Sequence, residues 1–256
     1  MSGVAALDLE LVARLEAHSV TAWPPSVCER AADGWTFRAT PGLARGRSNH
    51  ALPPCRGLSP QEIADGVRRT EAFATSHGIG PGVQVSPLEL HGRLEERLRA
   101  LGWVQQKPVL VMSATAAAIA SAGPALALTT SGHADQAWLR AWGSCEPARD
   151  VQAHVDTVFS QLGGRARFAR SGQQAVGIVV ESGGLAGLFC LAVAPALRRR
   201  GLGSALVRGL LAGCADQAVA YLQVEGHNRA AVAMYERLGF DLTYRYRHAS
   251  PPGTAF

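Results

Sequence analysis

Apolar residues recur at helical or strand spacing along most of this 256-residue chain. From residue 135 onward the pattern predicts two helices, three strands, and then a helix, a strand, a helix and a strand. The predicted helices are Asp135–Trp142, Val151–Leu162, Gly201–Cys214 and Arg229–Leu238, and the predicted strands are Arg165–Arg170, Ala175–Glu181, Leu185–Ala194, Val219–Glu225 and Phe240–Arg247. This alternation indicates an α/β protein in which helices flank a sheet.

The first half of the chain repeats part of that order. Its predicted elements are the helices Ser59–His77 and Pro87–Leu101 and the strands Gly82–Ser86 and Pro108–Met112. The stretch "LRALGWVQQKPVLV" also aligns with "YERLGFDLTYRYRH", so that Leu101-Gly102-Trp103 matches Leu238-Gly239-Phe240. Glycine so often ends a helix that this match has an ordinary explanation. Together with the shared element order, it favours a duplicated fold with domains 1–122 and 123–256.

The segment Pro108–Thr129 carries no charge over a length that could cross a bilayer. It consists mostly of alanine, serine and threonine, and Gly123-Pro124 lies inside it. Such a composition is a poor membrane span, so we expect a strand, a linker of small residues and another strand. The N-terminus becomes acidic and amphipathic too early for a signal peptide.

Composition narrows the choice of ligands and compartment. The hydrophobic content of 47% with 18% charged residues is typical of a globular protein. The net charge of +5 is scattered apart from Arg198–Arg200, with no basic run interleaved with aromatics, so nucleic acid is not an expected partner. The five cysteines are far apart, without metal-ligand spacing. We therefore expect reduced thiols, no metal site and a cytoplasmic protein.

The stretch "RRRGLGSALVRGLL" from Arg198 to Leu211 places two glycines before a predicted helix. The first amides of a helix lack internal partners and carry a partial positive charge, so such a turn suits an anion. A solvated basic loop is the plain alternative. A P-loop is excluded because no lysine follows the glycines. A dinucleotide-binding turn remains a weaker option, since Gly201, Gly203 and Glu225 fit but Leu206 stands at the third glycine.

The R-x-x-G-x-G pattern of Arg198, Gly201 and Gly203, together with "GLFCLAVAPALRRRGLGSALVRGLLAGC" and "AYLQVEGHNRAAVAMYERLGF", resembles the GNAT family of Gcn5-related N-acyltransferases. The resemblance implies a mixed, mostly antiparallel sheet flanked by helices, with acetyl-CoA as cosubstrate. It further implies that the strand residues Leu191, Ala192 and Val193 bind pantetheine, and that the turn residues Arg198, Arg199, Arg200, Gly201, Leu202, Gly203 and Ser204 hold the diphosphate. The whole chain also resembles actinobacterial tandem GNAT proteins, whose degenerate N-terminal copy carries a segment like "GWTFRATPGLARGRSNHALPP".

Tyr235 lies seven residues after Asn228, two turns along the same helix face. A phenol can protonate a leaving thiolate, and the family resemblance favours Tyr235 as general acid over a core tyrosine. Asn228 is expected to cap the helix and, by the resemblance, to contact the coenzyme. For the base, Gln223 cannot accept a proton. Glu225 on the same strand face is the candidate base or ammonium anchor, with His227 a lesser candidate and water a further option.

The first copy lacks this chemistry. No R-x-x-G-x-G precedes Ser59–His77, and Leu98 stands where the second copy has Tyr235. Trp35 and the run Arg47-Ser48-Asn49-His50 are polar or aromatic residues that could line an acceptor pocket, although a folded surface hairpin is the preferred interpretation.

These observations predict an N-acetyltransferase in which a primary amine attacks acetyl-CoA directly in a ternary complex. The acceptor is a small-molecule or peptide amine, no membrane is involved, and the protein is a monomer or homodimer. Two alternatives remain: a non-catalytic acyl-CoA sensor that uses the same turn, and an amide-forming transferase that draws on aminoacyl-tRNA.

Overall fold

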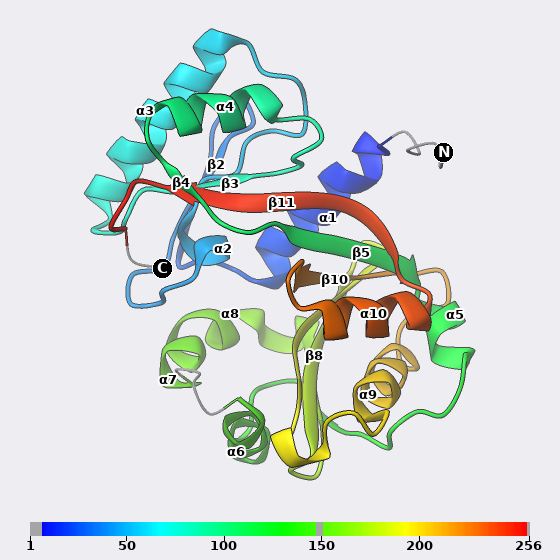
Figure 1. The fold of residues 1–256 in the computed structure, drawn as a ribbon. Coiled ribbons are helices and arrows are strands. Elements are labelled where there is room, and N and C mark those ends of the chain that lie inside the picture. Colours follow the sequence, from blue (N-terminus) through cyan, green and yellow to red (C-terminus); the bar gives the residue numbers. More distant parts are fainter. Residues whose placement is uncertain (1–6, 147–150, 255–256) are drawn as a thin grey trace. The chain divides into compact units, whose positions relative to one another are not determined.

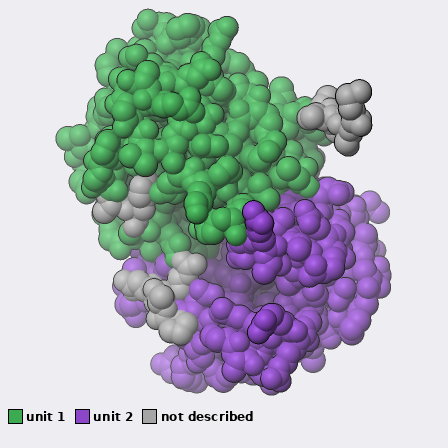
Figure 2. Space-filling model, in the orientation of Figure 1, with its two compact units in different colours: residues 1–111, 225–227, 242–256 green, residues 112–224, 228–241 purple. Residues whose placement is uncertain are grey.

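The computed structural model describes residues 7–146 and 151–254. Its contacts divide into two compact units, coloured separately in Figure 2. Unit 1 comprises residues 1–111, 225–227 and 242–256, and unit 2 comprises residues 112–224 and 228–241. These units are not two contiguous segments, because part of the C-terminal chain belongs to unit 1. The predicted domains 1–122 and 123–256 are a different division of the chain and stay a prediction.

Unit 1 combines three longer helices with short antiparallel strands (Figure 1). The helices are α1 (Leu9–Ala22), α2 (Gly46–Asn49), α3 (Pro60–Ser76) and α4 (Gly92–Ala100). The strands are β1 (Val27–Arg30), β2 (Thr36–Ala39), β3 (Val83–Val85), β4 (Val104–Gln105), the start of β5 (Val109–Thr115) and most of β11 (Asp241–Ser250). β1 and β2 form a hairpin, and β3 and β4 each pair antiparallel with β11.

The core of unit 1 lies where α3 and α4 pack against β2, β3 and β11. Leu94 and Leu98 of α4 and Val83 and Val85 of β3 are fully buried there. Trp35 belongs to the same cluster, and a Cβ on Gly66 of α3 would lie only 2.2 Å from its ring. A glycine at that position therefore lets the helix approach the indole directly.

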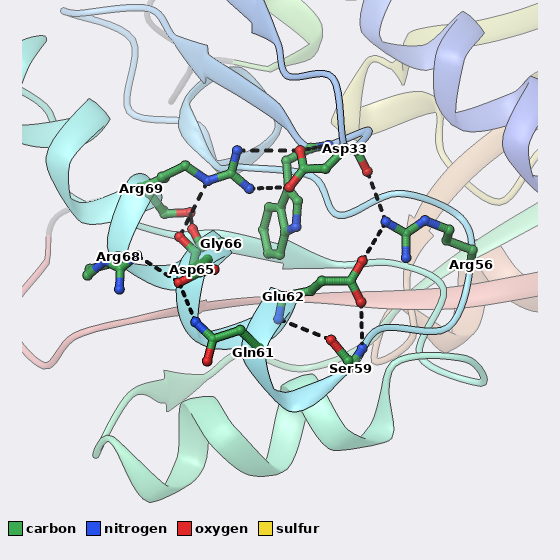
Figure 3. A network of polar contacts seen from close by, with 11 residues as sticks. Asp33, Arg56, Ser59, Gln61, Glu62, Asp65, Gly66, Arg68 and Arg69 are labelled. Carbon is green, nitrogen blue, oxygen red and sulfur yellow. Dashed lines mark hydrogen bonds and ion pairs between the residues drawn. The ribbon is translucent and has the colours of Figure 1, made fainter.

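Charged residues fasten the start of α3 to the β1–β2 hairpin (Figure 3). Ser59 and Glu62 form a capping box, each bonding the other's backbone amide. Arg56 pairs with Glu62 at 2.8 Å and also donates to the carbonyl of Asp33, while Arg69 bonds the Asp33 carboxylate. The backbone bond from Ser59, followed by the bond from Arg56, lowers the pKa of Glu62 to about 2. The bond from Arg69 likewise lowers the pKa of Asp33.

Unit 2 contains a sheet with the order β10-β9-β8-β7-β6, antiparallel except for the parallel pair β9 and β10. The strands are β6 (Thr129–Ser131), β7 (Ala166–Ser171), β8 (Ala175–Ser182), β9 (Leu185–Val193) and β10 (Val219–Glu225). The helices are α5 (Ala116–Ser121), α6 (Gln136–Cys145), α7 (Val151–His154), α8 (Ser160–Leu162), α9 (Leu202–Leu211) and α10 (Arg229–Leu238). In Figure 1, α6 and α9 lie on either side of β8. This explains why β8 is buried from Ala175 to Val180.

The mixed sheet flanked by helices confirms the predicted fold class, and the predicted element order from residue 135 onward is present. The small-residue linker was wrong in part, because Ala116–Ser121 forms helix α5. A π-helical turn at Val155–Phe159 interrupts the helix predicted over Val151–Leu162. Among the described residues, no helix is both long enough and apolar enough to cross a membrane.

Candidate active site

The pairing between strands β9 and β10 ends midway along β9. Their parallel pairing joins Leu185–Gly187 to Val219–Tyr221, yet β9 continues to Val193. Just beyond the last pair, Cys190 has a φ of 50° and the register between β8 and β9 shifts, so β9 bulges there. Nothing in the sequence pattern predicted a left-handed residue that is not glycine at this point.

The predicted pantetheine strand lies directly after the bulge. Ala192 pairs with Val176, and Val193 pairs with Ala175, both on the β8 side. β10 does not pair with this part of β9. Among the described residues, no strand pairs with this edge of β9, although the Val193 carbonyl accepts a bond from Arg198. An extended ligand with amide groups could pair with the unpaired edge.

Backbone amides without hydrogen-bond acceptors lie at the start of α9, directly after the turn that follows β9. Gly201 is the N-cap in the left-handed region, with φ of 79°, and offers no capping side chain. The first amide bonded within the helix is that of Ala205, which donates to the Gly201 carbonyl at 3.1 Å. In the part of the chain that the structure describes, the amides of Leu202, Gly203 and Ser204 have no acceptor. Three unbonded amides at a helix N-terminus are able to bind an anion.

The three arginines of the turn have different roles. The Arg198 guanidinium donates to the Val193 carbonyl at 3.0 Å and to the Cys145 carbonyl at 3.2 Å, so it ties the turn to the ends of β9 and α6. Arg199 and Arg200 are exposed, and neither forms an ion pair with a described residue. The side chains available to a ligand are therefore those of Arg199 and Arg200, while Arg198 shapes the turn.

Helix α10 positions the predicted general acid. Asn228 is its N-cap, as predicted, and the Asn228 side-chain oxygen accepts the Ala231 amide at 3.2 Å. The ring of Tyr235 is 7% exposed and lies edge-on to Phe240, with centroids 6.0 Å apart. The Tyr235 hydroxyl makes no hydrogen bond to a described residue. Burial raises the pKa of Tyr235 to about 12, so the phenol stays protonated at neutral pH.

The two candidate bases, Glu225 and His227, contact each other at the end of β10. Glu225 Oε2 lies 3.1 Å from His227 Nε2, and both side chains are at least half exposed. The intervening Gly226 amide donates to the Pro108 carbonyl at 2.9 Å, which fixes the backbone of the pair. The sequence presented Glu225 and His227 as competing candidates, whereas the structure joins them. Both belong to unit 1, whereas Leu191–Ser204, Asn228 and Tyr235 belong to unit 2.

The candidate acceptor residues of the N-terminal region have structural partners. Trp35 is fully buried in the unit 1 core, and His50 is 2% exposed. Asn49 bonds the Thr40 amide and the Leu43 carbonyl, which closes the loop around it. Ser48 accepts the indole N–H of Trp23 at 3.1 Å. Arg47 differs from these residues, since it is partly exposed and its guanidinium lies 5.4 Å from the centre of the Trp23 ring.

Residues 11–249 match the model of a protein family described as "Probable histone acetyltransferase Rv0428c C-terminal". The chain belongs to this family. The search of curated proteins returned no match for this member of the family.

Solved structures show that this family member has the fold of GNAT acetyltransferases. A GCN5-related N-acetyltransferase from Kribbella flavida has a TM-score of 0.69 at 14% identity, over 95% of this chain and 96% of that one. A conserved protein of unknown function from Staphylococcus epidermidis has a TM-score of 0.65 at 12% identity, over 90% and 95%. A tandem GNAT protein from the clavulanic acid biosynthesis pathway has a TM-score of 0.61 at 14% identity, over 94% and 92%.

Proposed function

We propose that this protein transfers an acetyl group from acetyl-CoA to a primary amine. The observation that carries the proposal is the set of unbonded amides at Leu202, Gly203 and Ser204, which follow the left-handed Gly201 and the freed edge of β9 within one unit. The chain's family is described as an acetyltransferase family, which supports the same reaction.

The residues present suit the coenzyme in two places. The backbone of Leu191–Val193 would pair with the pantetheine amides, and the amides from Arg199 to Ser204 would hold the diphosphate. The free side chains of Arg199 and Arg200 add attraction for its negative charge. Asn228, whose oxygen caps α10, retains its amide nitrogen for a further contact. When bound, acetyl-CoA supplies an activated acyl carbon and a thiol leaving group.

Residues of the chain would then accept a proton from the attacking amine and donate a proton to the leaving thiolate. The attacking amine must be neutral, and the carboxylate of Glu225 or the imidazole of His227 beside it is the proposed proton acceptor. The phenol of Tyr235 is protonated and has no hydrogen-bond partner in the described part of the chain, so it is the proposed donor to the departing sulfur. No residue of the chain is acylated in this scheme, because the amine attacks the thioester directly. The acceptor class is a small-molecule or peptide amine.

A substitution at Ser204 tests the proposed anion site in a protein that remains folded. A carboxylate in the first turn stabilises a helix but would occupy the site of the diphosphate. Ser204→Glu should therefore weaken CoA binding, measured by titration calorimetry, at least tenfold, while the melting temperature stays equal or rises. Ser204→Ala is the matched control and should bind CoA nearly as the unchanged protein does. Equal CoA affinity of Ser204→Glu and the unchanged protein would refute the proposed site.

Turnover assays separate the proposal from its alternatives. Release of free CoA thiol with a panel of primary amines is the expected result. CoA binding with no turnover on any amine would favour a sensor, and loss of activity on ribonuclease treatment would favour an aminoacyl-tRNA donor. Glu225→Gln and His227→Gln should each lower kcat, because each removes one of the two candidate proton acceptors that lie 3.1 Å apart.

The N-terminal region is proposed to be a degenerate copy of the catalytic fold. Its helix α4 ends in the same hydrogen-bonded turn as α10, and the alignment places Leu98 opposite Tyr235. We also propose a cytoplasmic location, on the basis of the free cysteines.

A further inference from the structure

A small cavity of about 160 Å³ lies within unit 1, and none of its lining residues is assigned to acetyl transfer. Helix α1 forms one wall, and the β1–β2 hairpin and the chain around Pro53 form the others. Most of this lining is apolar or small, including Ala13 and Ala17 of α1. Two charged side chains, Glu16 and Arg30, line the same cavity.

The Glu16 carboxylate is 5% exposed and receives hydrogen bonds from neutral groups alone. The hydroxyl of Tyr244 donates to it at 2.8 Å, the amide of Gln84 donates at 3.3 Å, and the hydroxyl of Ser86 donates as well. Among the described residues, no lysine or arginine contacts the carboxylate. The nearest buried cation, Arg38, donates to the far side of Gln84 at 2.9 Å. Three fixed donors thus hold a carboxylate in the cavity wall without a cation against it.

Burial raises the pKa of Glu16, whereas the bonds from Ser86 and Tyr244 and the charge of Arg38 lower it. A cation placed against the carboxylate from the cavity side would act in the same direction as these donors.

Arg30 presents the opposite charge. It is the last residue of β1, its side chain is exposed, and in the described part of the chain it has no carboxylate partner. It also forms no ion pair with Glu16, so more than 4 Å separates their charged atoms. One cavity is therefore lined by a carboxylate and a guanidinium that do not neutralise each other.

We propose that this cavity binds a small zwitterionic amino acid, with its ammonium group on Glu16 and its carboxylate on Arg30. A ligand with both charges satisfies both side chains, whereas a simple amine or a simple acid leaves one charge unmatched in a confined space. The apolar walls suit a short aliphatic chain between the two groups, and the volume limits its length. The cavity wall shares no residue with the proposed coenzyme turn, and the proposal does not depend on acetyl transfer.

Ligand-observed NMR and titration calorimetry on the full chain, without coenzyme, test this site. The probes are glycine, β-alanine and 4-aminobutyrate, which vary the separation of the two charges. Butylamine and butyrate carry only one charge each. We expect saturable binding of at least one zwitterion, and at least tenfold weaker binding of both singly charged compounds.

Three variants locate the binding. Glu16→Gln and Arg30→Gln each remove one charge, and Ala17→Leu places a larger side chain at an exposed position on the cavity wall. Each should weaken zwitterion binding at least tenfold. Glu10→Gln, an exposed position on the same helix, is the matched control and should bind normally.

Absence of saturable zwitterion binding to the unchanged protein would overturn the proposal. So would normal affinity in Arg30→Gln and Ala17→Leu, which leave the hydrogen bonds of Glu16 intact and decide the matter even if Glu16→Gln unfolds. Preferential binding of butylamine or butyrate would also overturn it, in favour of a site for a single charge. None of these outcomes affects acetyl transfer, since the assay contains no coenzyme.

Discussion

The helices α4 of unit 1 and α10 of unit 2 end in the same way. The amide of Gly102 bonds the Arg99 carbonyl at 2.9 Å, and the amide of Gly239 bonds the Glu236 carbonyl at 2.9 Å. The next residues, Trp103 and Phe240, each reach back five residues at 3.0 Å. Both glycines have positive φ, 77° and 96°, as a Schellman cap requires.

The difference lies in the side chain at the start of each cap. In α4 this residue is Leu98, which is fully buried in the unit 1 core. In α10 it is Tyr235, whose ring packs on Phe240 while its hydroxyl has no partner among the described residues. The same helix cap thus positions a core leucine in unit 1 and a phenol in unit 2. The comparison shows that a helix cap defines a position, and that the side chain placed there decides its chemistry.

The largest expected effect comes from removing the one hydroxyl that distinguishes the two helix ends. Tyr235→Phe should lower kcat by a factor of roughly 10² to 10⁴, the usual cost of losing a general acid. Its melting temperature should stay nearly constant, because the hydroxyl has no hydrogen bond to lose. Steady-state kinetics with thermal unfolding measure both, and an unchanged kcat would make Tyr235 a packing residue like Leu98.

The second largest effect should be a greater loss of stability in unit 1 than in unit 2 when the pH is lowered. Burial lowers the pKa of His50 to about 3 and the pKa of His248 well below its usual value, and both histidines lie in unit 1. The unfolded chain then binds protons more tightly than the folded one, so their contribution is complete above about pH 6.5 and is lost as the pH falls. Between pH 7 and 5 we expect a loss on the order of 2 kcal/mol from His50 and a further loss of the same sign from His248.

Hydrogen exchange at pH 7 and pH 5, corrected for intrinsic rates, measures this loss for each unit. Protection in unit 1 should fall more than protection in unit 2, and an equal fall in both would contradict the prediction. Glu16 acts in the opposite direction because burial raises its pKa. His133→Gln, a substitution at an exposed position, is the control for a histidine that is not buried.

Leu98→Ala tests the packing role directly. Removing a fully buried leucine should cost about 3 kcal/mol, within the range seen for such core truncations. Denaturant unfolding gives the free energy, and CoA binding gives the matched readout for unit 2. A loss of CoA affinity as large as that in Ser204→Glu, with folded protein, would show that Leu98 serves more than the unit 1 core.

The smallest effects should come from the caps themselves. Gly102→Ala and Gly239→Ala each force a side chain into the left-handed region, at a cost of roughly 1–2 kcal/mol. A Cβ on Gly102 would meet no atom within 4 Å, and one on Gly239 would meet Ile119 at only 3.5 Å, so neither adds a clash. Thermal unfolding should show similar losses for both variants. A loss in one variant alone would mean that the two caps are not equivalent.

Local sequence signals anticipated the parts of the fold that depend on neighbouring residues. The helix ends at Gly102 and Gly239, the glycine turn before α9 and the N-cap at Asn228 all follow from such signals. Helix α5 was missed because its alanines have no polar face to reveal a helical period. The bulge at Cys190 was missed because a left-handed φ at a non-glycine residue depends on the strands around it.

The amino-acid sequence by itself determined the order of elements in unit 2 and the position of the glycine turn before α9. These features depend on backbone preferences and hydrogen bonds that span a few residues. The tertiary structure alone decided that Trp35 is core, that Glu225 pairs with His227 and that Arg198 serves the turn. It alone also brings Tyr244 to Glu16, 228 residues away along the chain. Burial and the choice of polar partner are set by such distant contacts, which no local pattern contains.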